Sequence, residues 1–390
     1  MGVEVVSRVQ ELLRAADLKA VALASPDAIR YVSGVQLPLP IWAGTAMAGG
    51  VPMVMMGAHE SQGPLLVLAN TEAWTVAEAE SGPGFAQPYT AFDGVRAVNA
   101  RAAYHDAVAE VWRRLELGND ACRVGLDKAV PFFIADHLKR YTPKIEFVDV
   151  EPTLGAARRL KTFEEVAKLR AAVKVNDLGQ KAFGECAVPG ITELDLWAAI
   201  VSRIQSAVGG RLMVTGELVS GPRTATVNYP GGPTRRRIES GDTAILDLSV
   251  CVDGYWSDTT NTVVVGASAT SRQLTCFQAA REAFEAGLAA LQPGTPCSAV
   301  EGVIRDCLAR SGFKTVHYVG HQIGTSVNEA PRLVAYESDA IEVSMVFALE
   351  PGAYEGPAGT TGARLEKNIL VTAAGPEVLS EFDWGITDER

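Results

Sequence analysis

The sequence predicts a two-domain protein in which an α/β domain precedes an α+β domain. Its 390 residues exceed the length at which a single hydrophobic core stops growing. The first part alternates short apolar segments with helical ones, whereas the second part combines capped helices with a strand hairpin. We therefore expect one domain over residues 1–158 and a second over residues 159–390.

The α/β domain is expected to begin with an amphipathic helix and a buried strand. Residues 5–16 place their apolar side chains on one helical stripe, and residues 20–24 are entirely apolar. Strand-like segments follow at residues 52–56, 65–68 and 124–126, and a helical stretch covers residues 102–115. Residues 151–161 indicate a break before the second domain.

The second domain is expected to open with two capped helices. Thr162 can cap the first helix, which has glutamates in its first turn, and Thr192 can cap the second. The second helix follows Pro189-Gly190, and a similar segment with Pro293-Gly294 occurs 293 − 189 = 104 residues later. This repetition favours an internal duplication, although Pro-Gly pairs also precede helices by chance.

A hairpin between these helices carries two candidate ligands. Residues 243–250 and 262–265 are strand-like, and Asp253-Gly254 between them is a turn signal. Asp247 lies inside the apolar first strand, where an unpaired carboxylate would lose several kcal/mol of solvation energy. Asp258 follows after the turn, so both carboxylates can face one cation.

Three further candidates accompany apolar strand-like runs. Glu350 ends the run at residues 345–349, Glu366 precedes the run at residues 369–371, and His321 lies between closely spaced glycines. A single buried histidine is more often structural than a ligand. Four carboxylates and one imidazole, however, suit a pair of divalent ions such as manganese, iron, cobalt or zinc. Such ions activate water and polarise a carbonyl group, which indicates hydrolysis.

Composition limits the partners and the compartment. The formal charge is −11 and the one dense basic run, residues 235–237, resembles a solvated turn, so nucleic-acid binding is not expected. The six cysteines form no CxxC pair, and the N-terminus lacks a charged region followed by an apolar stretch, which favours the cytoplasm. The apolar runs are shorter than the ~20 residues of a membrane helix, so no membrane span is expected.

Six short segments of the second domain form an ordered motif set. They are Gly241-Asp242, Leu246-Asp247-Leu248, the run from Asp253 to Thr259, Gly320-His321-Gln322-Ile323-Gly324, Glu350-Pro351-Gly352 and Arg364-Leu365-Glu366. This set resembles the motifs of the pita-bread metallopeptidase family, which includes methionine aminopeptidase, aminopeptidase P, prolidase and creatinase. Residues 18–24 and 29–34 resemble the creatinase-type N-terminal domain. The resemblance implies an α/β N-terminal domain and an α+β pita-bread catalytic domain.

The resemblance also implies roles for individual residues. Asp247 would bind one metal ion, Asp258 and Glu366 would bridge two ions, and His321 with Glu350 would hold the second. Manganese is the first choice of metal, with cobalt, iron or zinc as alternatives.

Three catalytic roles follow from the same resemblance. Glu350 would shuttle protons. Arg364 would orient Glu366 or a neighbouring carboxylate. His317 would bond the substrate, or else be satisfied by a backbone carbonyl.

Two asparagines and a glutamine depart from the family pattern. Asn228 and Asn328 stand where peptide-cleaving relatives usually carry histidine, and they can bind a substrate but cannot exchange a proton near neutral pH. Gln322 replaces the commoner glycine after His321, which makes a changed substrate credible.

Three functions are compatible with this sequence. The first is a metal-dependent hydrolase of the Xaa-Pro dipeptidase or aminopeptidase type. The second is a non-peptide hydrolase or lyase on the same scaffold, similar to ectoine hydrolase or dimethylsulfoniopropionate lyase. The third, an inactive binding protein, is disfavoured because all five ligands are retained. A homodimer is typical of the resemblance, and the loop at residues 38–50 with Trp42 is a candidate cover for a neighbouring site.

Overall fold

The computed structural model describes residues 3–37, 48–59, 61, 63–73, 75, 84–117, 120–227 and 231–386. The chain forms two compact units, Met1–Arg158 and Arg159–Arg390, and each is described by itself. Within the described residues, no helix is both long and apolar enough to cross a membrane.

A six-stranded mixed sheet organises the first unit. The strand order is β4-β3-β2-β1-β5-β6, in which β1 pairs antiparallel with β2 and parallel with β5. Its strands are β1 (Ala20–Leu23), β2 (Met53–Gly57), β3 (Leu65–Ala69), β4 (Phe85–Tyr89), β5 (Cys122–Leu126) and β6 (Ile145–Asp149). Its helices are α1 (Val3–Ala15), α2 (Pro26–Ser33), α4 (Ala100–Arg114), α5 (Phe132–Lys139) and α6 (Glu151–Arg159), with a 3₁₀ turn η1 (Asn70–Glu72).

Strand β1 separates two hydrophobic cores because successive side chains of a strand point to opposite faces. Val21 and Leu23 pack with the apolar stripe of α1 and with α2. Ala20 and Ala22 instead face the core that α4 and α5 cover. The first unit is therefore a layered α/β domain, as the alternating segments predict.

The boundary between the two units, after Arg158, lies inside the expected break at residues 151–161, but most of that segment is helical. Residues 151–159 form helix α6, whose proline lies in the first turn, where its missing N–H costs little. Leu154 and Ala157 are buried in the same core as α1. Apolar contact thus keeps this segment helical although its glycine, proline and charged residues favour a loop.

The second unit combines two helix pairs with antiparallel strands. Its helices are α7 (Phe163–Cys186), α8 (Glu193–Val208), α9 (Ser271–Ala290) and α10 (Cys297–Arg310), with a 3₁₀ turn η2 (Gly221–Ala225). One sheet is β7 (Met213–Ser220), β8 (Thr243–Val252) and β9 (Tyr255–Val264). A second, five-stranded sheet consists of β10 (Gly320–Gln322), β11 (Glu329–Arg332), β12 (Val346–Leu349), β15 (Lys367–Thr372) and β16 (Gly375–Val378). A third sheet pairs β13 (Gly352–Tyr354) with β14 (Gly362–Arg364).

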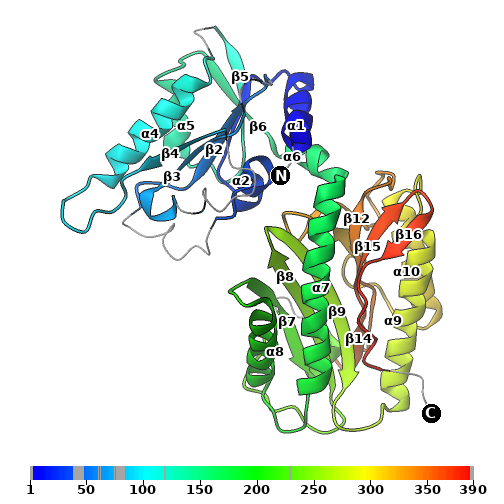
Figure 1. Ribbon diagram of the computed structural model, residues 1–390. Helices are drawn as coiled ribbons and strands as arrows, with labels where there is room; N and C mark the ends of the chain where they lie inside the picture. The colour runs from blue at the N-terminus through cyan, green and yellow to red at the C-terminus, as the bar shows by residue number, and fades with distance from the viewer. Residues whose placement is uncertain are drawn as a thin grey trace. The chain divides into compact units, whose positions relative to one another are not determined.

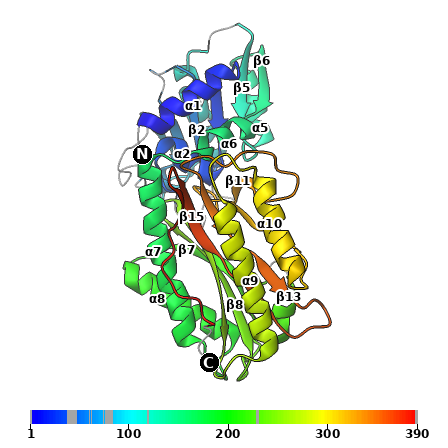
Figure 2. The ribbon, with the colours of Figure 1, turned by 90° about the vertical axis from the view of Figure 1, so that its right-hand side faces the viewer.

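The strands lie between the helix pair α7 and α8 and the pair α9 and α10 (Figures 1 and 2). Each pair follows the same local pattern. The segments after Pro189-Gly190 and Pro293-Gly294 both begin a helix, and isolated bridges join Thr192 to Arg237 and Pro296 to Ala340. These equivalent bridges support the internal duplication.

Helix α7 fixes the two strands that carry the aspartates. It begins with a capping box at Thr162, and its buried Asn176 donates to the carbonyl of Leu248 at 2.6 Å. Gln180 likewise donates to the carbonyl of Thr259 at 2.9 Å. A Cβ atom at Gly179 would lie only 2.3 Å from the Leu248 side chain, so this glycine permits the close approach.

The hairpin of β8 and β9 sets which side chains share a face. Asp253 and Gly254 turn the chain with positive φ angles of 47° and 77°. Strand β9 begins at Tyr255 rather than at residue 262, so Asp258 lies inside the strand and pairs with Ser249. Asp247 and Asp258 therefore project from the same face, because paired residues of antiparallel strands do so.

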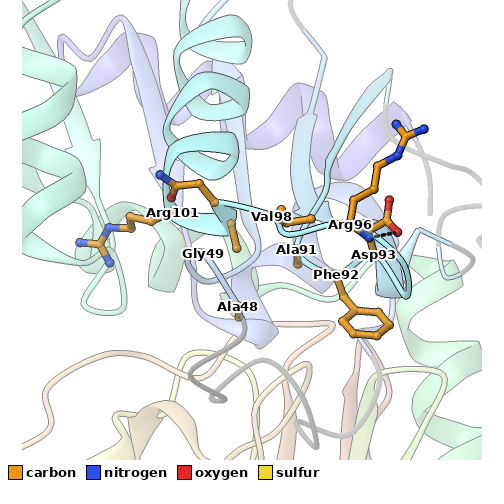
Figure 3. A pocket seen from close by; sticks show the side chains of 10 residues that line it. Ala48, Gly49, Ala91, Phe92, Asp93, Arg96, Val98 and Arg101 are labelled. Carbon is orange, nitrogen blue, oxygen red and sulfur yellow. Dashed lines mark hydrogen bonds between the residues drawn. The ribbon is translucent and has the colours of Figure 1, made fainter.

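A cavity of about 670 Å³ lies in the first unit, where the end of β4 meets the start of α4 (Figure 3). Its acidic side chain, Asp93, accepts hydrogen bonds from the backbone N–H groups of Val95 and Arg96. The predicted site residues that the structure describes all lie in the other unit.

Candidate metal centre

The five expected metal ligands converge from separate strands. Asp247 lies on β8, Asp258 on β9 and His321 on β10, while Glu350 follows β12 and Glu366 joins β14 to β15. Asp258, His321 and Glu366 each offer one ligand atom, and these atoms lie within 4.8 Å of one another. An isolated bridge between Thr260 and Glu366 joins β9 to the other strands.

His321 presents one nitrogen to the carboxylates. Its Nδ1 lies 2.9 Å from the carbonyl oxygen of Gln322, which can only accept, so Nδ1 carries the proton. Nε2 then has a free lone pair and lies 3.7 Å from Asp258 Oδ2 and 3.6 Å from Glu350 Oε1. Burial lowers the pKa of His321 to about 4, so the ring is neutral near pH 7 and suited to bind a cation.

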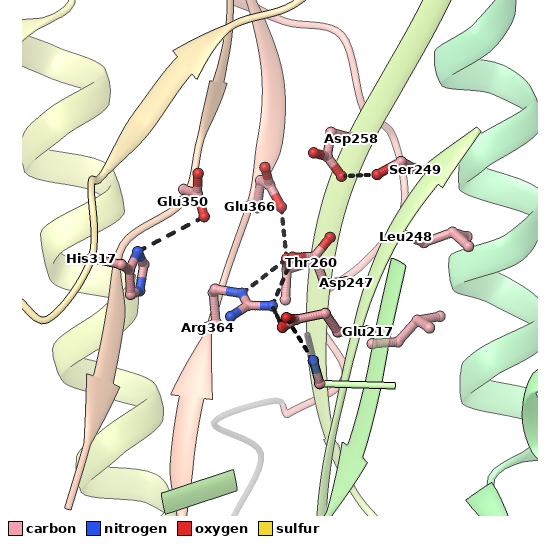
Figure 4. A network of polar contacts seen from close by, with 12 residues as sticks. Glu217, Asp247, Leu248, Ser249, Asp258, Thr260, His317, Glu350, Arg364 and Glu366 are labelled. Atoms are coloured by element: carbon pink, nitrogen blue, oxygen red, sulfur yellow. Dashed lines mark hydrogen bonds and ion pairs between the residues drawn. The ribbon is translucent and has the colours of Figure 1, made fainter. Parts of the chain in front are cut away.

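Hydrogen bonds orient three of the carboxylates (Figure 4). Ser249 donates to Asp258 Oδ1 at 2.9 Å, and Thr260 donates to Glu366 Oε2 at 2.6 Å. Arg364 Nη2 donates to Asp247 Oδ2 at 2.7 Å.

The carboxylates carry more negative charge than the neighbouring guanidinium group offsets. Burial, followed by the charge of Glu366, raises the pKa of both Asp258 and Glu350 well above the usual range. Burial and the charge of Asp247 raise the pKa of Glu366 to about 8. Oε1 of Glu350 is buried and has no hydrogen-bond partner among the described residues. Divalent cations would offset this charge, and a set of carboxylate and imidazole ligands fits manganese, iron, cobalt or zinc.

Arg364 has two carboxylate partners in the structure. Besides Asp247, its Nη2 donates to Glu217 Oε2 at 2.9 Å. Its contact with Glu366 is indirect, because Nε lies 3.3 Å from Thr260 Oγ1, which donates to Glu366. The sequence predicted that Arg364 would orient Glu366 or a neighbouring carboxylate. Arg364 contacts the neighbouring carboxylate of Asp247 directly and reaches Glu366 only through Thr260.

Both ring nitrogens of His317 have protein partners. Nδ1 lies 2.5 Å from the Tyr318 carbonyl oxygen, so it donates, and Nε2 accepts from Tyr354 at 3.1 Å. Nδ1 is also 3.9 Å from Glu350 Oε2. Burial, with a smaller effect of Arg364, lowers the pKa of His317 to about 4, so the ring is neutral near pH 7.

Asn328 links two side chains at the edge of the cluster. It donates to the Tyr318 hydroxyl at 3.2 Å and accepts from Arg332 Nε at 2.8 Å. The Tyr318 and His321 rings meet edge to face, with centroids 5.7 Å apart. Asn328 therefore holds a tyrosine and an exposed arginine beside His321. Asn228, the other expected substrate-binding residue, lies outside the described residues, as does Trp42.

Gln322 points away from the carboxylates, because it follows His321 in a strand and faces the opposite side. Its Oε1 accepts from Lys161 at 2.7 Å, and its amide donates to the Ala330 carbonyl at 3.1 Å. Lys161 also pairs with buried Glu329 at 3.1 Å. Gln322 thus belongs to a buried polar network. Its presence in place of glycine therefore does not indicate a changed substrate.

Several residues of the cluster were absent from the sequence-based prediction. Ser249 and Thr260 could have been found from strand alternation, because each is two residues from an expected ligand. Glu217 is the one charged residue of β7, and Arg332 lies four residues after Asn328. Their partners lie on distant segments, so their roles are visible only in the fold.

Comparison with known proteins identifies the family. The model of the creatinase/prolidase N-terminal domain matches residues 6–160, and the model of metallopeptidase family M24 matches residues 167–373, more than half of the chain. The chain belongs to metallopeptidase family M24. This M24 member is thus a hydrolase of the metallopeptidase type, and the expected fold class and family are confirmed.

Curated relatives of this M24 protein include dipeptidases. It is 27% identical over 263 residues to the Xaa-Pro dipeptidase of Pyrococcus furiosus, which covers 67% of this chain and 74% of the relative. It is 28% identical over 255 residues to the putative dipeptidase YkvY of Bacillus subtilis, covering 64% of this chain and 68% of the relative.

Solved structures share the fold of this M24 protein over nearly its whole length. The prolidase from Pyrococcus horikoshii OT3 superposes with a TM-score of 0.79 at 22% identity, covering 98% of this chain and 100% of the other. The X-Pro aminopeptidase from Thermotoga maritima MSB8 gives a TM-score of 0.77 at 19% identity, covering 97% and 98%.

Proposed function

We propose that the protein is a metal-dependent dipeptidase that cleaves short peptides with proline in the second position. The observation that carries this proposal is the convergence of Asp258 and Glu366 with neutral His321, beside which Glu350 Oε1 lies 3.6 Å from Nε2. The names of the relatives supply the preference for proline. They also make the non-peptide hydrolase or lyase the less favoured alternative.

The chain's own residues would divide the work of peptide hydrolysis. When bound, two divalent cations lower the pKa of a water molecule and polarise the substrate carbonyl. Asp247, Asp258, His321, Glu350 and Glu366 would hold the cations. Glu350 Oε1 is placed to accept a proton from the attacking water and to return it to the leaving nitrogen. His317, which the Tyr318 carbonyl and the Tyr354 hydroxyl hold in place, would line the site as a neutral ring 3.9 Å from Glu350.

Arg332 supports a dipeptidase rather than an aminopeptidase that cleaves long peptides. It is exposed, it pairs across the strands with His321, and Asn328 holds its Nε. A guanidinium group binds a carboxylate through paired hydrogen bonds. We therefore assign it the free carboxylate at the C-terminus of a dipeptide, while Asn328 contributes by positioning it.

Manganese as the native metal, a homodimeric assembly and a cytoplasmic location stay predictions of the sequence. Manganese is favoured because carboxylate oxygens make up most of the ligand set. Metal analysis of the protein as isolated from its natural host would test the first, and light scattering would test the second.

The function is tested by the turnover of manganese-loaded protein on Ala-Pro, Ala-Pro amide, Ala-Ala, a proline tripeptide, ectoine and dimethylsulfoniopropionate. We expect cleavage of Ala-Pro and much slower cleavage of its amide, because the amide removes the carboxylate. Turnover of ectoine or dimethylsulfoniopropionate without peptide cleavage would establish the alternative instead.

A further inference from the structure

Glu217 forms part of the polar network although it is not one of the five expected ligands. It lies on β7 directly opposite Asp247 on β8, so both carboxylates leave the same face of the sheet. Two like charges in this position repel each other and need a shared partner. Arg364 is that partner, since one nitrogen, Nη2, donates to Asp247 at 2.7 Å and to Glu217 at 2.9 Å (Figure 4).

The other oxygen of Glu217 is also engaged. The backbone N–H of Gly231 donates to Oε1 at 3.0 Å. Glu217 therefore uses both oxygens as acceptors, one for the main chain and one for Arg364. Its side chain is only 12% exposed, so water screens its charge less than at an open surface.

The position of Arg364 creates a conflict at the metal centre. A fixed positive charge beside Asp247 opposes the binding of a cation by the same carboxylate. Glu217 offsets that charge and holds the guanidinium group on the side of Asp247 that faces β7. The other carboxylate oxygen of Asp247, Oδ1, would then be the one that holds the cation.

We infer that Glu217 is a positioning residue, which holds Arg364 between itself and Asp247 and strengthens binding of divalent cations at the Asp247 side of the site. The inference rests on the proposed metal centre. It concerns a contact outside the family motifs of the sequence, because Glu217 lies before the first of them.

The test is calorimetric titration of the metal-free full chain with Mn²⁺, comparing wild type with Glu217→Gln. Glutamine has the same size but only one acceptor oxygen, so it cannot serve both Gly231 and Arg364, and it lacks the charge. We expect the dissociation constant at one of the two sites to rise about tenfold, the usual cost of losing a group that orients a metal ligand. Glu217→Asp keeps the charge and should lose less.

Two controls separate positioning from general damage. Glu377→Gln removes one charge from an arginine pair on the same unit, away from the site, and should bind Mn²⁺ as wild type does. Thermal unfolding of each metal-free variant reports whether the fold is intact. If Glu217→Gln is partly unfolded, the Mn²⁺ affinity of Glu217→Asp is used instead, provided that its unfolding midpoint equals that of the wild type. An affinity of this variant equal to that of the wild type would then count against the inference, and a modest weakening would support it.

The Arg364→Met background tests the route of the effect. If Glu217 acts through Arg364, adding Glu217→Gln to Arg364→Met should cause no further weakening. An equal weakening in both backgrounds would mean that Glu217 acts on the cation independently, and wild-type affinity of Glu217→Gln would overturn the inference directly. Absence of Mn²⁺ binding by the wild type would instead contradict the proposed metal centre.

Discussion

Arg332 on β11 stands directly opposite His321 on β10, and its guanidinium carbon lies 5.4 Å from the centre of the Tyr318 ring. The exposed cation thus lies on the same face as the neutral imidazole of the site. Arg332 is therefore the residue to which the proposed function assigns the C-terminal carboxylate of a dipeptide.

Replacing Arg332 by alanine should weaken dipeptide hydrolysis. Loss of a hydrogen bond to a charged group costs about 2 kcal/mol, or about 30-fold in kcat/KM. Most of this loss should appear in KM, because the carboxylate is bound both before and during the reaction. Cleavage of Ala-Pro amide by Arg332→Ala should match that of the wild type; an equal loss on both substrates would contradict the assignment.

Replacing Asn328 by alanine should have a smaller effect of the same kind. The variant loses the bonds to Tyr318 and Arg332, each worth about 1 kcal/mol, so KM for Ala-Pro should rise about fivefold with little change in kcat. Steady-state kinetics measure both constants. A fall in kcat at unchanged KM would indicate a role in the chemical step instead.

Lys161→Met should destabilise the second unit. Lys161 and Glu329 are almost completely buried, with side chains 1% and 6% exposed, and removal of one partner leaves the other charge unpaired. The expected loss is about 3 kcal/mol in the free energy of unfolding. Denaturant unfolding gives this value. The exposed pair of Arg170 and Glu377 is the control, because Arg170→Met should change stability by less than about 1 kcal/mol.

His105 should make the first unit sensitive to mild acid. Burial, followed by the charge of His137, lowers the pKa of His105 below its ordinary value of 6.5, and Arg101 and Arg140 act in the same direction. As the pH falls below 6.5, the unfolded chain binds the proton before the folded chain does, so stability decreases until folded His105 is also protonated. Above 6.5 both states are neutral and this effect is absent.

The pH effect is measured by following the unfolding midpoint of wild type and His105→Phe from about pH 7 to about pH 5. Phenylalanine preserves the stacking on Phe133, whose ring lies 5.9 Å away and nearly parallel. The wild-type midpoint should fall more steeply. Parallel curves for the two proteins would show that His105 contributes nothing in this range.

The segments around Asp247, Glu350 and Glu366 were largely predictable because each places one charged residue within or beside an apolar run. Asp247 within β8 is the clearest case, since its cost in an apolar strand requires a partner. The motif order then placed His321, Glu350 and Glu366 in one site, and the structure brings them together. The start of β9 was less predictable, because Ser257 and Asp258 are polar although both are buried in the strand.

Other features depend on contacts between distant positions. Glu217 and Arg364 are 147 residues apart, and Lys161 and Gln322 are 161 residues apart, so no local pattern links them. Gln322 was expected beside the site because it follows His321, which made a changed substrate credible, but strand alternation places it on the opposite face. Helix α6 was missed since its burial depends on packing against α1.

The metal centre is tested most directly by diffraction from crystals of the manganese-loaded protein at the manganese absorption edge. If the proposed metal centre is correct, we expect two anomalous peaks among Asp247, Asp258, His321, Glu350 and Glu366, with both peaks reduced or lost in Asp258→Asn. Peaks elsewhere, or an unmetallated cluster in crystals of active enzyme, would contradict it.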